Sequence, residues 1–131
     1  MPWYARGFWF PDRSVGLFRM CIFCKIANHQ MPARWVLEEE DVVAFHDIHP
    51  QAPTHILVIP RKHLTSLAHA EQQDEALLGK LMLAARRVAK EAGLVEGGYR
   101  VVINTGAGAG QSVFHLHIHV LGGRSWGWPP G

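Results

Sequence analysis

The sequence predicts a domain of the α+β class, with a largely antiparallel sheet and one long helix. Two patterns lead to this class. Apolar residues recur at three- and four-residue steps through residues 72–92, which is the stripe of an amphipathic helix, and Gly93 is suited to end it. Five short apolar stretches lie before and after this helix, and Pro, Gly or acidic turns separate them.

These stretches are the expected strands, at residues 34–37, 42–47, 55–59, 99–105 and 113–121. The first two form a hairpin around the acidic turn at residues 38–41, and Pro60 ends the third. A glycine-rich loop at 106–110 joins the last two. A short helix is expected over residues 21–28, before the turn at Met31 and Pro32.

The chain has 131 residues, enough for one hydrophobic core, and we expect one domain at 21–131. Residues 1–20 show no sustained period and contain several Pro and Gly residues, so they are expected to be a weakly structured extension. Met20 is an alternative start, and a transit peptide is the competing interpretation of the stretch before it.

The charge distribution bears on the partners. Of 13 Lys and Arg and 11 Asp and Glu residues, three basic residues and one acidic residue fall in 1–20, so residues 21–131 carry ten of each. A nucleic-acid-binding surface needs clustered basic residues, and no such partner is expected. No apolar run approaches the roughly 20 residues that span a bilayer. We therefore expect a cytoplasmic protein without a membrane partner.

Three histidines alternate with aliphatic residues in the run HLHIHVL at 115–121. On a strand this alternation places His115, His117 and His119 on one face, about 6.6 Å apart in sequence order. The outer two would then be too far apart to share one zinc ion, whose bonds to nitrogen are about 2 Å long. Such a line suits phosphate binding and nucleophilic chemistry near neutral pH, although a surface strand with incidental histidines is the plain alternative.

Cys21 and Cys24 have the Cys-x-x-Cys spacing. This spacing occurs in redox motifs and in metal sites, and two reduced buried thiols are the third interpretation. A redox motif would open a helix within a βαβ unit, and no such unit follows here.

The quoted histidine run resembles the His-x-His-x-His-x-x signature of the histidine triad (HIT) superfamily. The resemblance extends over residues 21–131 and is closest to the Hint branch of nucleotide phosphoramidases. It rests on three runs: AFHDIHPQAPTHILVIPRKH at 44–63, GQSVFHLHIHVLGG at 110–123 and WPPG at 128–131. It implies a HIT-like fold, an antiparallel five-stranded sheet with one long and one short helix, in which two protomers form a continuous sheet.

The resemblance also implies residue roles. His117 resembles the nucleophile, His119 and His55 its partners on the phosphate oxygens, and Ser112 the residue that assists the departing amine. Asp47 resembles the acid that receives the ribose hydroxyls; an Asx residue that caps the loop is the plain alternative. The other implied nucleotide contacts are Asn104, Gly110, Gln111 and Trp128, with a base slot of Ile22, Phe23, Ile26, Phe45, Ile48 and Leu57 that ordinary core packing would also explain.

Prokaryotic relatives in the superfamily resemble zinc proteins, and the matching positions here are Cys21, Cys24, His63 and His115. The resemblance thus implies a structural zinc, no cofactor for catalysis, and a homodimer. The implied activity proceeds through a nucleotidyl-histidine and hydrolyses the P–N bond of purine nucleoside 5′-phosphoramidates. Aminoacyl-adenylates are a second implied substrate. Two alternatives stay open: cleavage of dinucleoside polyphosphates, as in the Fhit branch, and a nucleotide-binding interaction module with incidental turnover.

Overall fold

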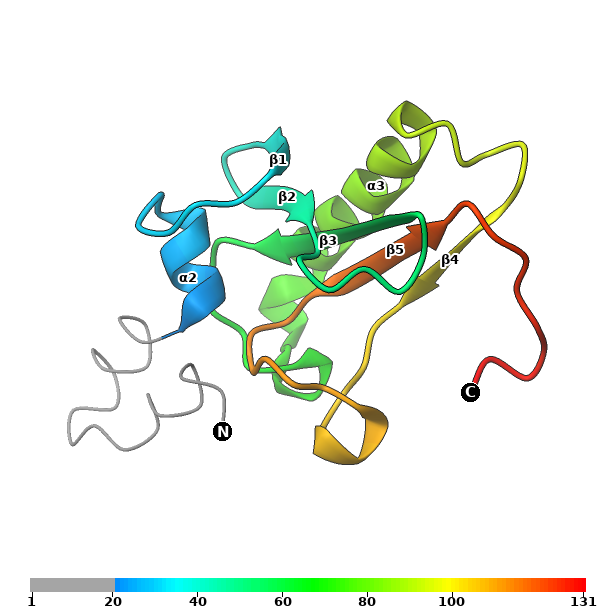
Figure 1. The fold of residues 1–131 in the computed structure, drawn as a ribbon. Coiled ribbons are helices and arrows are strands. Elements are labelled where there is room, and N and C mark those ends of the chain that lie inside the picture. The colour runs from blue at the N-terminus through cyan, green and yellow to red at the C-terminus, as the bar shows by residue number, and fades with distance from the viewer. Residues whose placement is uncertain (1–20) are drawn as a thin grey trace.

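The computed structural model describes residues 21–131, and the expected N-terminal extension lies outside the described residues. A five-stranded sheet has the order β1-β2-β3-β5-β4, and every neighbouring pair is antiparallel. The expected α+β class, with one long helix and one short one, is confirmed (Figure 1). The strands are β1 (Trp35–Glu38), β2 (Val42–His46), β3 (Thr54–Pro60), β4 (Tyr99–Val102) and β5 (Ile118–Gly122).

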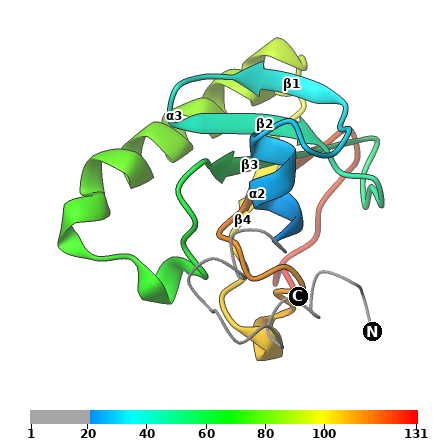
Figure 2. The ribbon, with the colours of Figure 1, turned by 90° about the vertical axis from the view of Figure 1, so that its left-hand side faces the viewer.

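Both faces of the sheet are covered. The long helix α3 (Glu75–Glu91) lies across one face, and the short helix α2 (Ile22–Ala27) packs on the other (Figures 1 and 2). The two-residue period of the central strands decides which side chain faces which helix: Val42 and Ala44 pack toward α3, whereas Val43 and Phe45 pack toward α2. Burial on both faces explains why these strands are continuously apolar.

The helices begin and end at recognisable signals. Cys21 is the N-cap of α2, and its sulfur accepts a hydrogen bond from the amide of Cys24 at 3.4 Å. The long helix starts after a 3₁₀ turn, η3 (Gln72–Asp74), where the side chain of Asp74 accepts from the amide of Glu71 at 2.9 Å. Two further 3₁₀ turns, η2 (Leu67–His69) and η4 (Ala107–Ala109), lie in the connections. None of the helices within residues 21–131 is both long and apolar enough to cross a bilayer.

The largest departure from the expected elements concerns the histidine strand. It was expected over residues 113–121, but β5 begins only at Ile118. The neighbouring strand β4 ends at Val102, which pairs with His119, so the residues before Ile118 have no partner on that side. Instead the amide of Leu116 donates to the carbonyl of Leu64 at 2.6 Å. The alternation of sides nevertheless continues before the strand, since Leu116 packs with Ile118 and Val120 in the cluster toward α3.

Candidate active site and metal centre

A pocket of about 470 Å³ lies beside α2, the end of β2 and the middle of β3, and we call it the histidine pocket. All six residues of the expected base slot line it, and four other expected site residues join them: Asp47, Ser112, His117 and His119. Phe23, Ile26, Phe45 and Leu57 are also members of the core cluster beneath α2. These four side chains therefore belong to the hydrophobic core and also form part of the pocket wall. Ile48 differs, because 81% of it is exposed.

His117 lines the pocket and is buried, and it makes a T-shaped contact with Phe23 at 5.1 Å between ring centroids. Its Nδ1 lies 2.7 Å from the carbonyl oxygen of His115. A carbonyl oxygen only accepts, so Nδ1 carries the proton and donates. The Nε2 lone pair of His117 is consequently available as a nucleophile. Burial lowers the pKa of His117, which keeps the ring neutral at pH 7.

Two further histidines form a relay next to it. The amide of Gln51 donates to Nδ1 of His55 at 3.0 Å, so the proton of a neutral His55 ring must be on Nε2. That nitrogen lies 2.9 Å from Nδ1 of His119, which accepts. The remaining proton of His119 is therefore on Nε2, where it can be donated to a bound group. The His117 and His119 rings are 4.9 Å apart at their centroids.

Burial lowers the pKa of His119 to about 4, and we expect its ring to stay neutral down to that pH. An unfolded histidine titrates near about 6.5, so between these values the unfolded chain binds more protons than the folded one. The stability associated with His119 should thus decrease as pH falls from about 6.5 toward 4. An NMR titration of the His119 ring protons checks the midpoint. A midpoint above pH 6, or an unchanged pH dependence of unfolding in His119→Gln, would contradict the burial argument.

The contacts of Asp47 fit both interpretations of this residue, the loop-capping Asx residue and the acid that faces a ligand. Its Oδ1 accepts from the amide of His49 at 2.8 Å, which is the loop-capping contact of an Asx turn. Its Oδ2 lies 3.4 Å from Nε2 of His55, and the side chain lines the histidine pocket. One carboxylate both fixes the loop after β2 and presents acceptors to the pocket. His46 and His49 also border this pocket.

The glycine-rich loop is held in place from within. The buried side chain of Gln111 accepts from the amide of Gly106 at 2.8 Å and donates to the carbonyl oxygens of Thr65 and Val113. The amide of Gly110, where φ is +96°, donates to Ala107. Hence neither the Gln111 side chain nor the Gly110 amide is available to a ligand in this arrangement.

Other groups near the loop are better placed for a ligand. Within residues 21–131 the amide of Ser112 has no acceptor, and the residue lines the pocket with His117 and His119. Asn104 does not line the histidine pocket but a separate one. Its Nδ2 lies 4.0 Å from the position that a Cβ on Gly110 would occupy.

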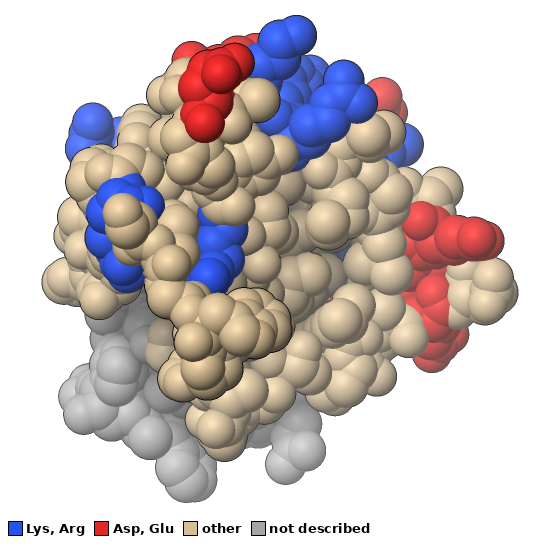
Figure 3. All heavy atoms as spheres, turned by 90° about the vertical axis from the view of Figure 1, so that its right-hand side faces the viewer, with Lys and Arg blue, Asp and Glu red and all other residues tan. Residues whose placement is uncertain are grey.

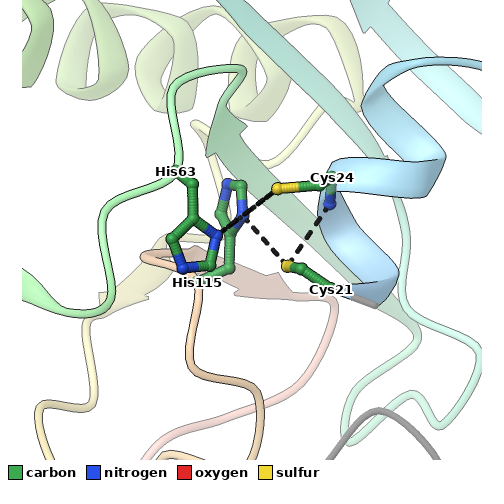
Figure 4. A group of neighbouring side chains, drawn as sticks. All are labelled: Cys21, Cys24, His63 and His115. Carbon is green, nitrogen blue, oxygen red and sulfur yellow. Dashed lines mark hydrogen bonds between the residues drawn. The ribbon is translucent and has the colours of Figure 1, made fainter. Parts of the chain in front are cut away.

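The three histidines of the triad do lie on one side, the side of α2, because the aliphatic residues that alternate with them pack toward α3 and both His115 and His117 contact Phe23. The expected strand is what differs, since His115 and His117 precede β5. His115 is fully buried, and its ring lies next to the two cysteines (Figure 4). Its Nε2 donates to the carbonyl of Pro60 at 2.8 Å, which leaves the lone pair on Nδ1. His115 therefore has two functions, since its ring faces the cysteines and its carbonyl holds the ring of His117.

The four residues expected to bind metal do come together. Cys21 and Cys24 come from the start of α2, His63 from the loop after β3 and His115 from the segment before β5 (Figure 4). Their ligand atoms all lie within 4.8 Å of one another. Nδ1 of His115 lies 3.3 Å and 3.5 Å from the two sulfurs and 3.2 Å from Nδ1 of His63.

These separations fit a tetrahedral metal ion. With zinc bonds of about 2.3 Å to sulfur and 2.05 Å to nitrogen, a tetrahedron places N and S about 3.5 Å apart and two nitrogens about 3.3 Å apart. A hydrogen bond from Cys24 lowers the pKa of Cys21 to about 2 and raises the pKa of Cys24, so Cys21 is the thiolate of the pair and Cys24 would release its proton on binding a cation. The cluster is a candidate Cys2His2 metal site with no open position.

A second pocket, of about 350 Å³, lies where β4 and β5 meet the C-terminal tail, and we call it the tail pocket. His55 and His119 line it, and so do Arg100, Arg124 and Trp126. Sequence reasoning missed the two arginines, because a lone Arg on a strand and a lone Arg after one carry no motif. Trp128, an expected nucleotide contact, is 84% exposed and lines neither pocket.

Histidines before and at the start of β5 line an apolar pocket next to a glycine-rich loop. On an antiparallel sheet, this arrangement is that of a histidine triad protein. The chain belongs to the HIT domain family, whose match covers residues 28–126. A "14 kDa zinc-binding protein" of Zea mays is 54% identical over 112 residues, covering 84% of this chain and 87% of the relative.

Solved structures agree with this assignment. A HIT family hydrolase from Legionella pneumophila superposes with a TM-score of 0.83 and 48% identity, covering 85% of this chain and 99% of that one. A histidine triad nucleotide-binding protein from Candida albicans gives a TM-score of 0.72 at 31% identity, covering 85% and 84%.

Proposed function

We propose that the protein is a nucleotide hydrolase of the Hint branch that cleaves the P–N bond of purine nucleoside 5′-phosphoramidates, and the P–O bond that joins the phosphate to the acyl group in aminoacyl-adenylates. The observation that carries the proposal is the tautomer of His117. With Nδ1 committed to the His115 carbonyl at 2.7 Å, Nε2 is a neutral imidazole nucleophile inside a largely apolar pocket. The names of the hydrolase and nucleotide-binding relatives support the same class.

The reaction proceeds in two displacements. Nε2 of His117 attacks the α-phosphorus, a bond forms between them, and the P–N bond to the amine breaks with its electron pair going to the amine nitrogen. That nitrogen takes up a proton from solvent by way of the Ser112 hydroxyl. Water then attacks the phosphorus, the bond to Nε2 breaks, His117 recovers its lone pair, and the proton of the water is released as the mononucleotide leaves.

The remaining groups bind charge and the nucleoside. The Nε2–H of His119 and the amide of Ser112 are donors that border the same pocket as His117, and they suit the non-bridging oxygens of the phosphate. Asp47 offers acceptors to the ribose hydroxyls. The apolar side chains beneath α2 provide a slot for the flat face of a purine.

A turnover panel tests this function. Adenosine and guanosine 5′-phosphoramidates should be hydrolysed with a higher kcat/KM than diadenosine polyphosphates. Preference for the polyphosphates would favour the Fhit-type activity. Tight binding of mononucleotides without turnover of either substrate would favour the interaction module.

We also propose that the Cys2His2 cluster binds a structural zinc. The fit of its N–N and N–S separations to a zinc tetrahedron supports this, and so does the name of the maize relative. Four protein ligands leave no place for water or substrate, so the metal would stabilise the fold and take no part in the reaction.

We expect a homodimer, because β4 is an edge strand and Met82 and Leu83 of α3 are exposed apolar residues. Light scattering should give twice the mass of the chain.

Deleting residues 126–131 should leave the dimer intact and change which amines are accepted, since tail residues line the tail pocket. Whether the tail also borders a partner's site stays a prediction. A monomeric mass, or unchanged kinetics across small and bulky amines, would contradict these expectations.

A further inference from the structure

The tail pocket adjoins the histidine pocket, because His119 lines both. His117 lines only the histidine pocket, where the nucleoside slot also lies. In an in-line displacement the leaving group departs on the side opposite the attacking nitrogen. A phosphorus held between His117 and His119 would keep the departing nitrogen beside Ser112 and direct the rest of the leaving group past His119 toward the tail pocket.

This pocket has an unusual charge. Arg100 and Arg124 line it, and no acidic residue does. Among the described residues, neither guanidinium has a carboxylate within ion-pair distance. Their partners are carbonyl oxygens: Arg100 donates to Gly127 at 2.8 Å, and Arg124 donates to Gln51 and Ser125 at 3.2 Å. Each guanidinium has five N–H donors, so each retains donors for a ligand.

The aromatic wall of the pocket points to the same kind of ligand. Both guanidinium groups approach the Trp126 ring, Arg124 at 3.7 Å and Arg100 at 5.4 Å from its centroid. Two cations thus lie at one aromatic ring. The buried indole N–H of Trp126 has no acceptor within residues 21–131. This wall therefore holds an excess of donors and positive charge, which an anionic acceptor would balance.

Figure 3 shows the face that bears the tail, with basic atoms between uncharged ones left of its middle and along its upper edge, and acidic atoms at its upper and right edges. We propose that the tail pocket is the leaving-group subsite and that it selects amines carrying a carboxylate. The preferred substrates would be nucleoside 5′-phosphoramidates of amino acids. The inference rests on the proposed function for its reaction, but its binding claim is separately testable. A guanidinium matches a carboxylate in a two-bond geometry that a neutral amide cannot reproduce.

The experiment compares two matched ligand pairs. The first pair is the adenosine 5′-phosphoramidates of β-alanine and of β-alanine amide, which differ by one charge, and kcat/KM is measured. The second pair consists of phosphonates in which CH2 replaces the bridging nitrogen, so that they bind without reacting, and Kd is measured by calorimetry. The wild type should favour the carboxylate by about tenfold in both measurements. Arg124→Gln and Arg100→Gln should bring each ratio toward one, and Arg124→Lys should restore part of it.

Arg86→Gln is the matched control, since Arg86 is exposed on α3 and lines neither pocket. It should leave both ratios unchanged. Equal affinity of the two phosphonates for the wild type would overturn the subsite, even if both phosphoramidates are hydrolysed. A preserved affinity ratio without any hydrolysis would uphold the subsite and overturn the proposed reaction. Ratios that fall equally in the Arg86 control would reduce the effect to general surface charge and also overturn the subsite.

Discussion

Replacement of His117 by alanine is expected to abolish the nucleotidyl adduct and to lower kcat on the order of 10⁴-fold or more, because it removes the atom that forms the covalent bond. The wild-type protein, quenched without acid during turnover, should gain the mass of one mononucleotide on His117. Phe23 packs edge-on against this ring, so the variant leaves a small cavity but keeps the surrounding core.

His69→Ala is the matched control for this experiment. His69 is exposed, its ring bonds only the hydroxyl of Ser66 at 2.8 Å, and it lines neither pocket. It should retain wild-type turnover and the adduct. An adduct on a residue other than His117, or single-step transfer with no adduct in the first turnover, would rule out the covalent mechanism.

Replacement of Cys24 by serine is expected to lower Tm by at least about 10 °C, because it removes one of four metal ligands and leaves a hydroxyl where the wild type buries a sulfur. Metal analysis of the wild type should find about one zinc per chain. Turnover measured well below Tm should fall less than stability does, since no metal position is open to substrate.

Chelation provides the internal control. A strong chelator should lower the Tm of the wild type toward that of Cys24→Ser and should have little further effect on the variant. If the wild type carries no zinc as purified and neither zinc nor chelator shifts its Tm, the structural site is absent. A chelator effect of equal size in the variant would show that the metal binds elsewhere.

The positions of the secondary elements could be predicted because their causes are local. The stripe in residues 72–92 marks one helical face, which the structure shows as η3 followed by α3. The continuous apolar runs of β2 and β3 reflect burial on both faces, which needs only the identities of the residues themselves. The base-slot residues were found through the family resemblance, and the structure brings all six to one pocket.

The histidines show where local reasoning ends. Alternation in the run 115–121 predicts three rings on one side, which the structure shows, but it does not predict that the strand begins only at Ile118. Whether a strand forms depends on a partner, and β4 ends opposite His119. The ring of His115 contacts Cys21, Cys24 and His63, and no local pattern could indicate this because the three residues are distant from it in sequence.

By itself the sequence determined the fold class, the apolar faces of the elements and the identity of the chemical groups, because periodicity and residue type are properties of the chain. Only the tertiary structure decided the tautomers of His55, His115 and His117, since each is set by a backbone group contributed from another segment or from a local turn. It alone placed Arg100 and Arg124 at one tryptophan ring. Such contacts join residues of arbitrary sequence separation, and no local pattern encodes them.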